Sequence, residues 1–149
     1  MQSVKTEKDL ELLGLIYKNV KMGSESIINL MPKVADDKLK SDMTEKMNSY
    51  ETYARKAEDL LLENGKRPKE ENLVTKLSSK AGIAMNTMID STTSHIAQMM
   101  IEGSTMNVTD LTKNIHKYDC EGAENDVLSF ARDIVNFEEK NIENMNQYL

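Results

Sequence analysis

Two histidines, His95 and His116, decide which metal chemistry this sequence of 149 residues could support. A di-iron centre in a helical bundle takes one Glu from each of two helices and a Glu-x-x-His pair from each of the other two. Thr92 stands three residues before His95, and Lys113 stands three residues before His116. Because the Glu-x-x-His spacing is absent at both histidines, the sequence predicts no di-iron centre of this kind.

A looser metal site is an alternative for the same histidines. If the first two helices turn near residue 35, counting residues from the predicted turns brings His95 close to Asp42 and His116. No cofactor is expected from the rest of the sequence. Imidazole and carboxylate side chains that lie close together can nevertheless bind iron, manganese or zinc. The candidate ligands are His95, Asp42, Glu45 and His116, with Asp119 as a further carboxylate. The competing interpretation makes His95 a hydrogen-bonded core imidazole above Ser91 and leaves His116 half-exposed.

Other kinds of catalytic site find no support in the sequence. There is no glycine-rich phosphate loop, no nucleophile elbow and no serine with an obvious neighbouring base. Cys120 is the one cysteine, and its acidic neighbours Asp119 and Glu121 oppose formation of a reactive thiolate. We therefore expect a protein without enzymatic activity.

Apolar residues recur at steps of three and four, which predicts helices along the whole chain. Thr6 followed by Asp9 is typical of a capped helix start, and Asp36 is suited to cap the second helix. The ends of the first three helices are marked by Pro32, Gly65 and Gly103. The expected helices cover about residues 6–34, 36–64, 69–103 and 109–147.

Short connections between long helices favour antiparallel neighbours. We therefore predict an all-α fold in which residues 1–149 form one domain, an up-down-up-down antiparallel four-helix bundle. The third predicted helix carries two apolar stripes, so we expect it to lie centrally. The fourth predicted helix is the longest, and Gly122 is the expected position of a bend in it.

The charge balance and hydropathy exclude two classes of partner. The net charge is −6 and no basic stripe is present, which argues against binding to nucleic acid. Polar residues interrupt the least charged stretch, 81–101, so we expect no membrane span. A lone cysteine and a charged N-terminus without an export signal favour a cytoplasmic location.

A cluster of methionines suggests a surface for protein association. Most of the 11 methionines fall at core positions, where they fill gaps. The segment Met99–Met106, near the predicted turn between the third and fourth helices, is the exception and predicts an exposed apolar patch. We expect a homodimer or a protein partner to contact this segment or the long fourth helix.

Two segments carry a resemblance to a known group of proteins. The segment AMNTMIDSTTSHIAQMMIEGSTM, residues 84–106, and the C-terminal VNFEEKNIENMNQYL resemble small ferritin-like four-helix-bundle proteins of firmicutes, many of them uncharacterised. The resemblance spans most of the chain and implies the fold and not an activity. Ferritin-like proteins with a working di-iron centre carry two Glu-x-x-His pairs, whereas this chain has Glu138, Glu139 and Glu143 without a histidine. No ligand is therefore carried over, and the departure argues against iron oxidation or storage.

Three functions stay open at this point. The first is a non-catalytic bundle that acts through protein association. The second is a degenerate metal-binding protein that uses His95 and nearby carboxylates. The third is a bundle that binds an apolar ligand between its helices, in space left by the small residues Ala81, Gly82, Ala84 and Ser91.

Overall fold

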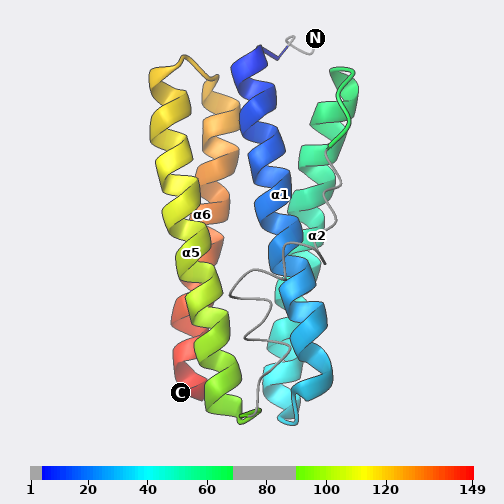
Figure 1. The fold of residues 1–149 in the computed structure, drawn as a ribbon, viewed down its shortest axis with the longest axis vertical. Coiled ribbons are helices and arrows are strands. Elements are labelled where there is room, and N and C mark those ends of the chain that lie inside the picture. Colours follow the sequence, from blue (N-terminus) through cyan, green and yellow to red (C-terminus); the bar gives the residue numbers. More distant parts are fainter. Residues whose placement is uncertain (1–4, 69–89) are drawn as a thin grey trace.

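The computed structural model describes residues 5–68 and 90–149, and the secondary structure in these ranges is entirely helical. Figure 1 shows an elongated bundle of long rods. Its α-helices are α1 (Glu7–Leu30), α2 (Asp37–Glu63), α5 (Thr93–Cys120) and α6 (Asn125–Met145). Two short 3-10 turns, η1 (Met31–Lys33) and η2 (Asn146–Tyr148), follow α1 and α6. The prediction of an all-α fold is confirmed.

The order of helix directions differs from the predicted one. At one end, Lys5 before α1 hydrogen-bonds to Asn64 after α2 and to Glu124 before α6. At the other end, the hydroxyl of Tyr148 after α6 donates to Asp42 near the start of α2. The pairs α1–α2 and α5–α6 are therefore antiparallel, but α2 and α5 run in the same direction (Figure 1). The up-down-up-down order assumed a short turn here, whereas α2 ends and α5 begins at opposite ends of the bundle.

Helix starts follow the predicted capping signals. The Thr6 hydroxyl accepts a hydrogen bond from the Asp9 backbone N–H at 3.2 Å, and the Asp9 carboxylate accepts one from the Thr6 N–H at 3.0 Å. Asp36 accepts from the Leu39 N–H at 2.7 Å at the start of α2. These bonds satisfy backbone donors that have no partner within the helix.

The predicted boundary between the third and fourth helices is wrong. Gly103 lies inside α5, where a helical glycine costs only about 1 kcal/mol relative to alanine. The real break is at Gly122, which has a φ of +88° that other residues rarely adopt. The Ala123 N–H bonds back to the Tyr118 carbonyl at 2.9 Å, which closes α5 with a glycine turn. Residues 109–147 therefore cover the C-terminal part of α5, all of α6 and the start of η2. The first part of the predicted third helix lies outside the described residues.

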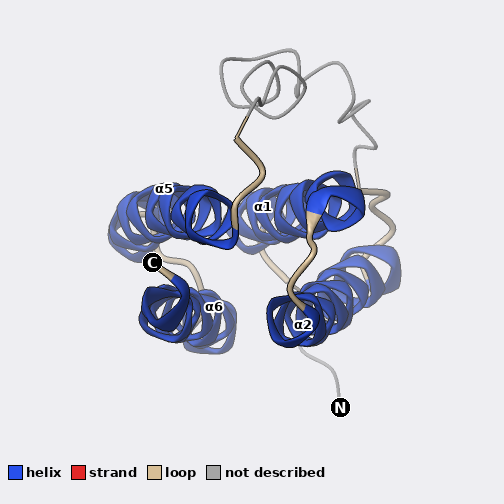
Figure 2. Cartoon of the chain, turned by 90° about the horizontal axis from the view of Figure 1, so that it is seen from below, coloured by secondary structure: helices blue, strands red, loops and turns tan. Residues whose placement is uncertain are grey.

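An apolar core fills the space between the four α-helices of the described ranges, which form a four-sided bundle when seen end-on (Figure 2). Between α2 and α6 the core is aromatic. The Tyr50 and Phe137 rings meet edge to face with centroids 5.1 Å apart, and Tyr53 lies 5.3 Å from Phe137. A Cβ at Gly23 on α1 would stand 2.6 Å from the Tyr50 ring, so the absence of a side chain there lets the ring reach α1.

None of the described helices is long and apolar enough to cross a membrane.

Candidate functional site

A group of polar side chains replaces the apolar core in the middle of the bundle. On α6, Glu138 and Asn141 occupy the part of the buried stripe between Ile134 and Met145. On α5, Ser104 falls between the buried Met100 and Leu111. We call this group the polar centre, and its members are Lys46 and Tyr50 from α2, Ser104 and Asn107 from α5, and Glu138 and Asn141 from α6.

The carboxylate of Glu138 is the most isolated group of the polar centre. Its side chain is 0% exposed, and neither carboxylate oxygen has a hydrogen-bond partner among the described residues. The Nδ2 atom of Asn141, one turn further along α6, likewise has no partner there. Burial raises the pKa of Glu138. The Tyr50 and Ser104 hydroxyls and the Asn107 amide act to lower it through donor contacts that fall outside ordinary hydrogen-bond geometry, and the charge of Lys46 lowers it further.

Lys46 is the positive charge that acts on Glu138, but its ammonium group is hydrogen-bonded elsewhere. Its Nζ donates to Asn144 Oδ1 at 2.7 Å, and no ion pair within 4 Å joins it to Glu138 in the part of the chain that the structure describes. Burial lowers the pKa of Lys46, and the charges that oppose this effect are Asp42 and Glu45 first and Glu138 last. Lys46 therefore makes its hydrogen bond to Asn144, while the charges of Asp42, Glu45 and Glu138 all favour its protonated form.

Tyr50 presents a phenol to the same space. Burial raises its pKa well above the usual value, and the negative charge of Glu138 adds to the effect. The phenol is therefore neutral at physiological pH. In that state its hydroxyl can donate one hydrogen bond and also offer oxygen lone pairs.

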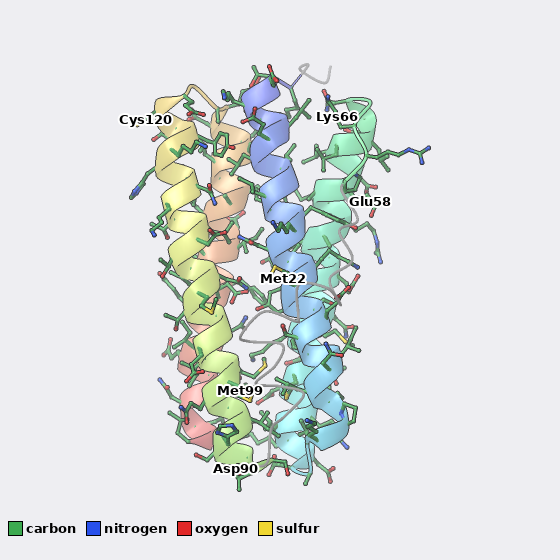
Figure 3. All side chains as sticks on the ribbon, viewed as in Figure 1. Met22, Glu58, Lys66, Asp90, Met99 and Cys120 are labelled. Carbon is green, nitrogen blue, oxygen red and sulfur yellow. The ribbon has the colours of Figure 1, made fainter. Side chains whose placement is uncertain are left out.

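The predicted metal ligands do not come together as a set. His95 lies half-buried at the start of α5, and His116 lies exposed near its end. Figure 3 labels Asp90 and Cys120 close to these two ends of the bundle. The histidines are about 20 residues apart on one helix, which is about 30 Å, so they cannot bind the same ion. Their predicted proximity rested on a turn at 103–109, where α5 continues instead.

The predicted carboxylate ligands lie on α2 near its start. Asp42 is half-buried and accepts the Tyr148 hydroxyl bond, while Glu45 is exposed. Within the described ranges, no group of three or more His, Cys, Asp and Glu side chains is placed to hold a metal ion. The polar centre also fails to fit a di-iron centre, because it offers one carboxylate and no histidine.

Sequence analysis missed the polar centre although a signal was present. The sequence presents Glu138 as an acid without a histidine partner, and the periodicity from Ile134 fits a stripe through Phe137, three residues further on, equally well. The spacing of three or four residues from Ile134 to Glu138, Asn141 and Met145 would have marked Glu138 as buried. Distinguishing these two adjacent stripes requires knowing how α6 is rotated in the bundle.

A second feature is a groove at the end of the bundle where α1 begins. Its cavity volume is about 470 Å³. Leu10, Leu15 and Tyr118 provide apolar surface around Gly14, whose Cβ position has nothing within 4 Å. The remaining lining residues are Leu61 and Pro68 together with the charged Glu7, Glu11, Lys18, Lys66 and Arg67. We call this feature the α1 groove.

The predicted apolar patch at Met99–Met106 is not a continuous surface. Met100 is 7% exposed and belongs to the core, while Met99 and Ile101 pack against that core. Met106 alone of these four is well exposed, at 64%. The four side chains point in different directions because this segment is helix and not a turn.

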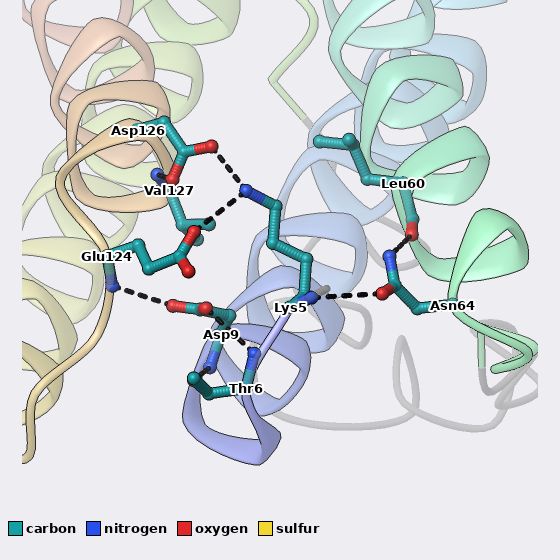
Figure 4. Close-up of polar contacts among 8 residues, drawn as sticks. All are labelled: Lys5, Thr6, Asp9, Leu60, Asn64, Glu124, Asp126 and Val127. Atoms are coloured by element: carbon teal, nitrogen blue, oxygen red, sulfur yellow. Dashed lines mark hydrogen bonds and ion pairs between the residues drawn. The ribbon is translucent and has the colours of Figure 1, made fainter. Parts of the chain in front are cut away.

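A polar network ties three helices together beside the α1 groove (Figure 4). Lys5 Nζ pairs with Glu124 at 3.1 Å and also with Asp126, and its backbone N–H donates to Asn64 Oδ1 at 3.1 Å. The buried Asp9 carboxylate accepts from the Glu124 N–H at 2.7 Å. The hydrogen bond from Lys5 holds the pKa of Asp126 below its usual value. We call this group the end network, and its role is structural.

The architecture defines a class of long helical bundles made of two antiparallel helix pairs. Within this class, the chain is similar to a crystal structure of a DUF305 fragment from Deinococcus radiodurans, with a TM-score of 0.73. The similarity covers 97% of both chains, and the sequences are 15% identical over it. Such a likeness shows the fold alone. No family model matches the chain, and no curated protein matches it.

Proposed function

We propose that this protein is a non-catalytic, ferritin-like bundle that works by binding a protein partner in the α1 groove. The observation that carries the proposal is the groove itself, which combines an apolar lining with charges of both signs. Amphipathic helices are bound by grooves of this chemistry. The ferritin-like arrangement is supported by the two antiparallel helix pairs and by the positions of the α2 end and the α5 start at opposite ends of the bundle, an order seen in bundles that are not strictly up-down-up-down.

A second copy of the chain is the partner that the charges favour. The outward side of α1 carries Glu7 and Glu11 before Gly14 and Lys18 after it. If two α1 helices cross antiparallel near Gly14, the acids of each copy lie opposite the lysine of the other. A glycine at the crossing point lets helix backbones approach closely, and an isologous contact of this kind closes as a dimer.

The test is a comparison of two lysine substitutions on α1. Leu15→Lys places a charge in the groove, whereas Ile28→Lys changes a residue of the same helix that is already 53% exposed and lies outside the groove. Light scattering coupled to gel filtration over a range of concentrations is expected to show dimers for wild type and Ile28→Lys and monomers for Leu15→Lys. A wild-type protein that stays monomeric at 200 µM or so would reject self-association, and unchanged dimers in Leu15→Lys would reject the groove.

Metal binding through His95 is a separate proposal from the sequence. Its support is limited to the position of His95 at the same bundle end as Asp42 and Glu45. Elemental analysis after anaerobic incubation with iron, manganese or zinc tests it, with His95→Ala as the control. Stoichiometric metal that is lost in His95→Ala would support the site, and equal metal contents would end it.

A further inference from the structure

The polar centre contains a buried carboxyl group whose two oxygens make no hydrogen bond of ordinary geometry to the described side chains. A carboxylate that is 0% exposed would lose several kcal/mol of hydration free energy on burial unless a proton, a cation or hydrogen bonds replaced the water. Both oxygens of Glu138 lack hydrogen-bond partners among the described residues. Lys46 donates to Asn144, and no ion pair within 4 Å joins it to this carboxylate among the described residues.

The side chains around Glu138 share one chemical property. Tyr50, Ser104 and Asn107 lie close enough to influence its ionisation, and they come from two helices on different sides of α6. Asn141 follows Glu138 by one turn and is also buried and incompletely bonded. Each of these four side chains carries an oxygen that can accept a bond, and hard cations prefer oxygen ligands.

We propose that the polar centre binds a single monovalent hard cation, Na⁺ or K⁺, with the Glu138 carboxylate as its charged ligand. Hydroxyl oxygens of Tyr50 and Ser104 and amide oxygens of Asn107 and Asn141 complete the oxygen shell. One carboxylate neutralises one monovalent charge, whereas a divalent ion bound to Glu138 alone would leave an uncompensated positive charge in the core. The polar centre shares no residue with the α1 groove or with the proposed His95 site. The light-scattering test and the elemental analysis therefore do not decide whether it binds a cation.

Thermal unfolding in matched salts tests the proposal. The melting temperature is measured at pH 7.5 in NaCl, KCl, MgCl₂, CaCl₂ and choline chloride at equal ionic strength. A cation that binds only the folded protein raises Tm, and we expect NaCl or KCl to raise it by about 3 °C or more above choline chloride. The Glu138→Gln variant is expected to lose this difference, because it keeps the side-chain shape and removes the charge. Glu139→Gln, at the exposed neighbouring position, is expected to keep it.

Each of the other results would overturn the proposal. Identical Tm values for wild type in all salts would show that a proton or buried water, and not a cation, compensates Glu138. A larger effect of MgCl₂ or CaCl₂ than of the monovalent salts would contradict the charge argument. A salt-specific shift that persists in Glu138→Gln would place the cation elsewhere in the molecule. If Glu138→Gln does not fold, Ser104→Ala, which removes one neutral ligand, must reduce the NaCl or KCl shift.

Discussion

Asp9 in the end network and Glu138 in the polar centre are both carboxylates with 0% exposure, yet their surroundings are opposite. Asp9 accepts backbone hydrogen bonds from Thr6 and from Glu124, at the starts of α1 and α6. Helix N-termini favour negative charge, so this carboxylate is stabilised by the fold itself. Glu138 lies in the middle of its helix, where backbone N–H groups are already used. Burial alone therefore does not distinguish a structural acid from a candidate binding group. The distinction comes from whether the carboxylate oxygens have hydrogen-bond donors.

The largest expected effect comes from removing the satisfied acid. Asp9→Ala deletes bonds to two helix starts and leaves their N–H groups without these partners, so we expect a loss of about 3 kcal/mol in the free energy of unfolding. Urea denaturation measures it. Asp37→Ala, at an exposed acid in the first turn of α2, is the control and should change stability by less than about 0.5 kcal/mol. Equal effects at the two positions would erase the contrast between Asp9 and ordinary surface acids.

Replacing the unsatisfied acid should act in the opposite direction. In choline chloride at pH 8, we expect Glu138→Gln to raise the free energy of unfolding by about 1–2 kcal/mol, because no buried charge is then left unpaired. The pKa of Glu138 is raised in the folded protein, so the unfolded chain releases its proton at lower pH. Wild-type stability should therefore fall, relative to Glu138→Gln, as pH rises from the ordinary glutamate pKa to the raised one. Urea denaturation of both proteins from pH 4 to 8 measures their free energies of unfolding. An advantage of Glu138→Gln over wild type that grows towards low pH would contradict the prediction.

A glycine pair probes how the end network is assembled. Gly122 ends α5 with a φ of +88° and thereby brings Glu124 to Asp9, so Gly122→Ala should cost about 1 kcal/mol. Gly103 lies within α5, and nothing stands within 4 Å of its Cβ position. Gly103→Ala should instead stabilise the protein by up to about 1 kcal/mol. Thermal unfolding shows whether each substitution raises or lowers stability. If Gly122→Ala and Gly103→Ala both stabilise the protein, the conformation of Gly122 is unimportant.

The smallest effect is expected at the rim of the end network. Asp126 is 61% exposed in its side chain, so solvent screens its pairing with Lys5, and Asp126→Asn should cost less than about 1 kcal/mol near pH 7. The pKa of Asp126 is lowered in the folded state. Its contribution is therefore present above the ordinary aspartate pKa and is lost as pH falls through the lowered value. Denaturation of wild type and Asp126→Asn at pH 7 and pH 2.5 should show this difference shrinking, and a cost above 2 kcal/mol would make this pair as important as Asp9.

The sequence predicted local features well and relations between helices poorly. Periodicity and capping residues gave the helical class and the starts of α1 and α2, because these depend on residues within one turn. The break at Gly122 was expected only as a bend, since a glycine does not reveal its φ. The turn assigned to Gly103 then misplaced His116 by the length of half a helix. Residues 81–84, the basis of the apolar-ligand hypothesis, lie outside the described residues.

The division of the described helices into two antiparallel hairpins affects how the molecule folds. Each antiparallel pair is made of helices that are neighbours in the sequence, so the α1–α2 and α5–α6 hairpins can each form from local contacts. The polar centre, in contrast, needs Tyr50 from the first hairpin and Glu138 from the second. The carboxylate therefore keeps its water until the hairpins dock, and we expect docking to be the step at which solution ions influence the folding rate.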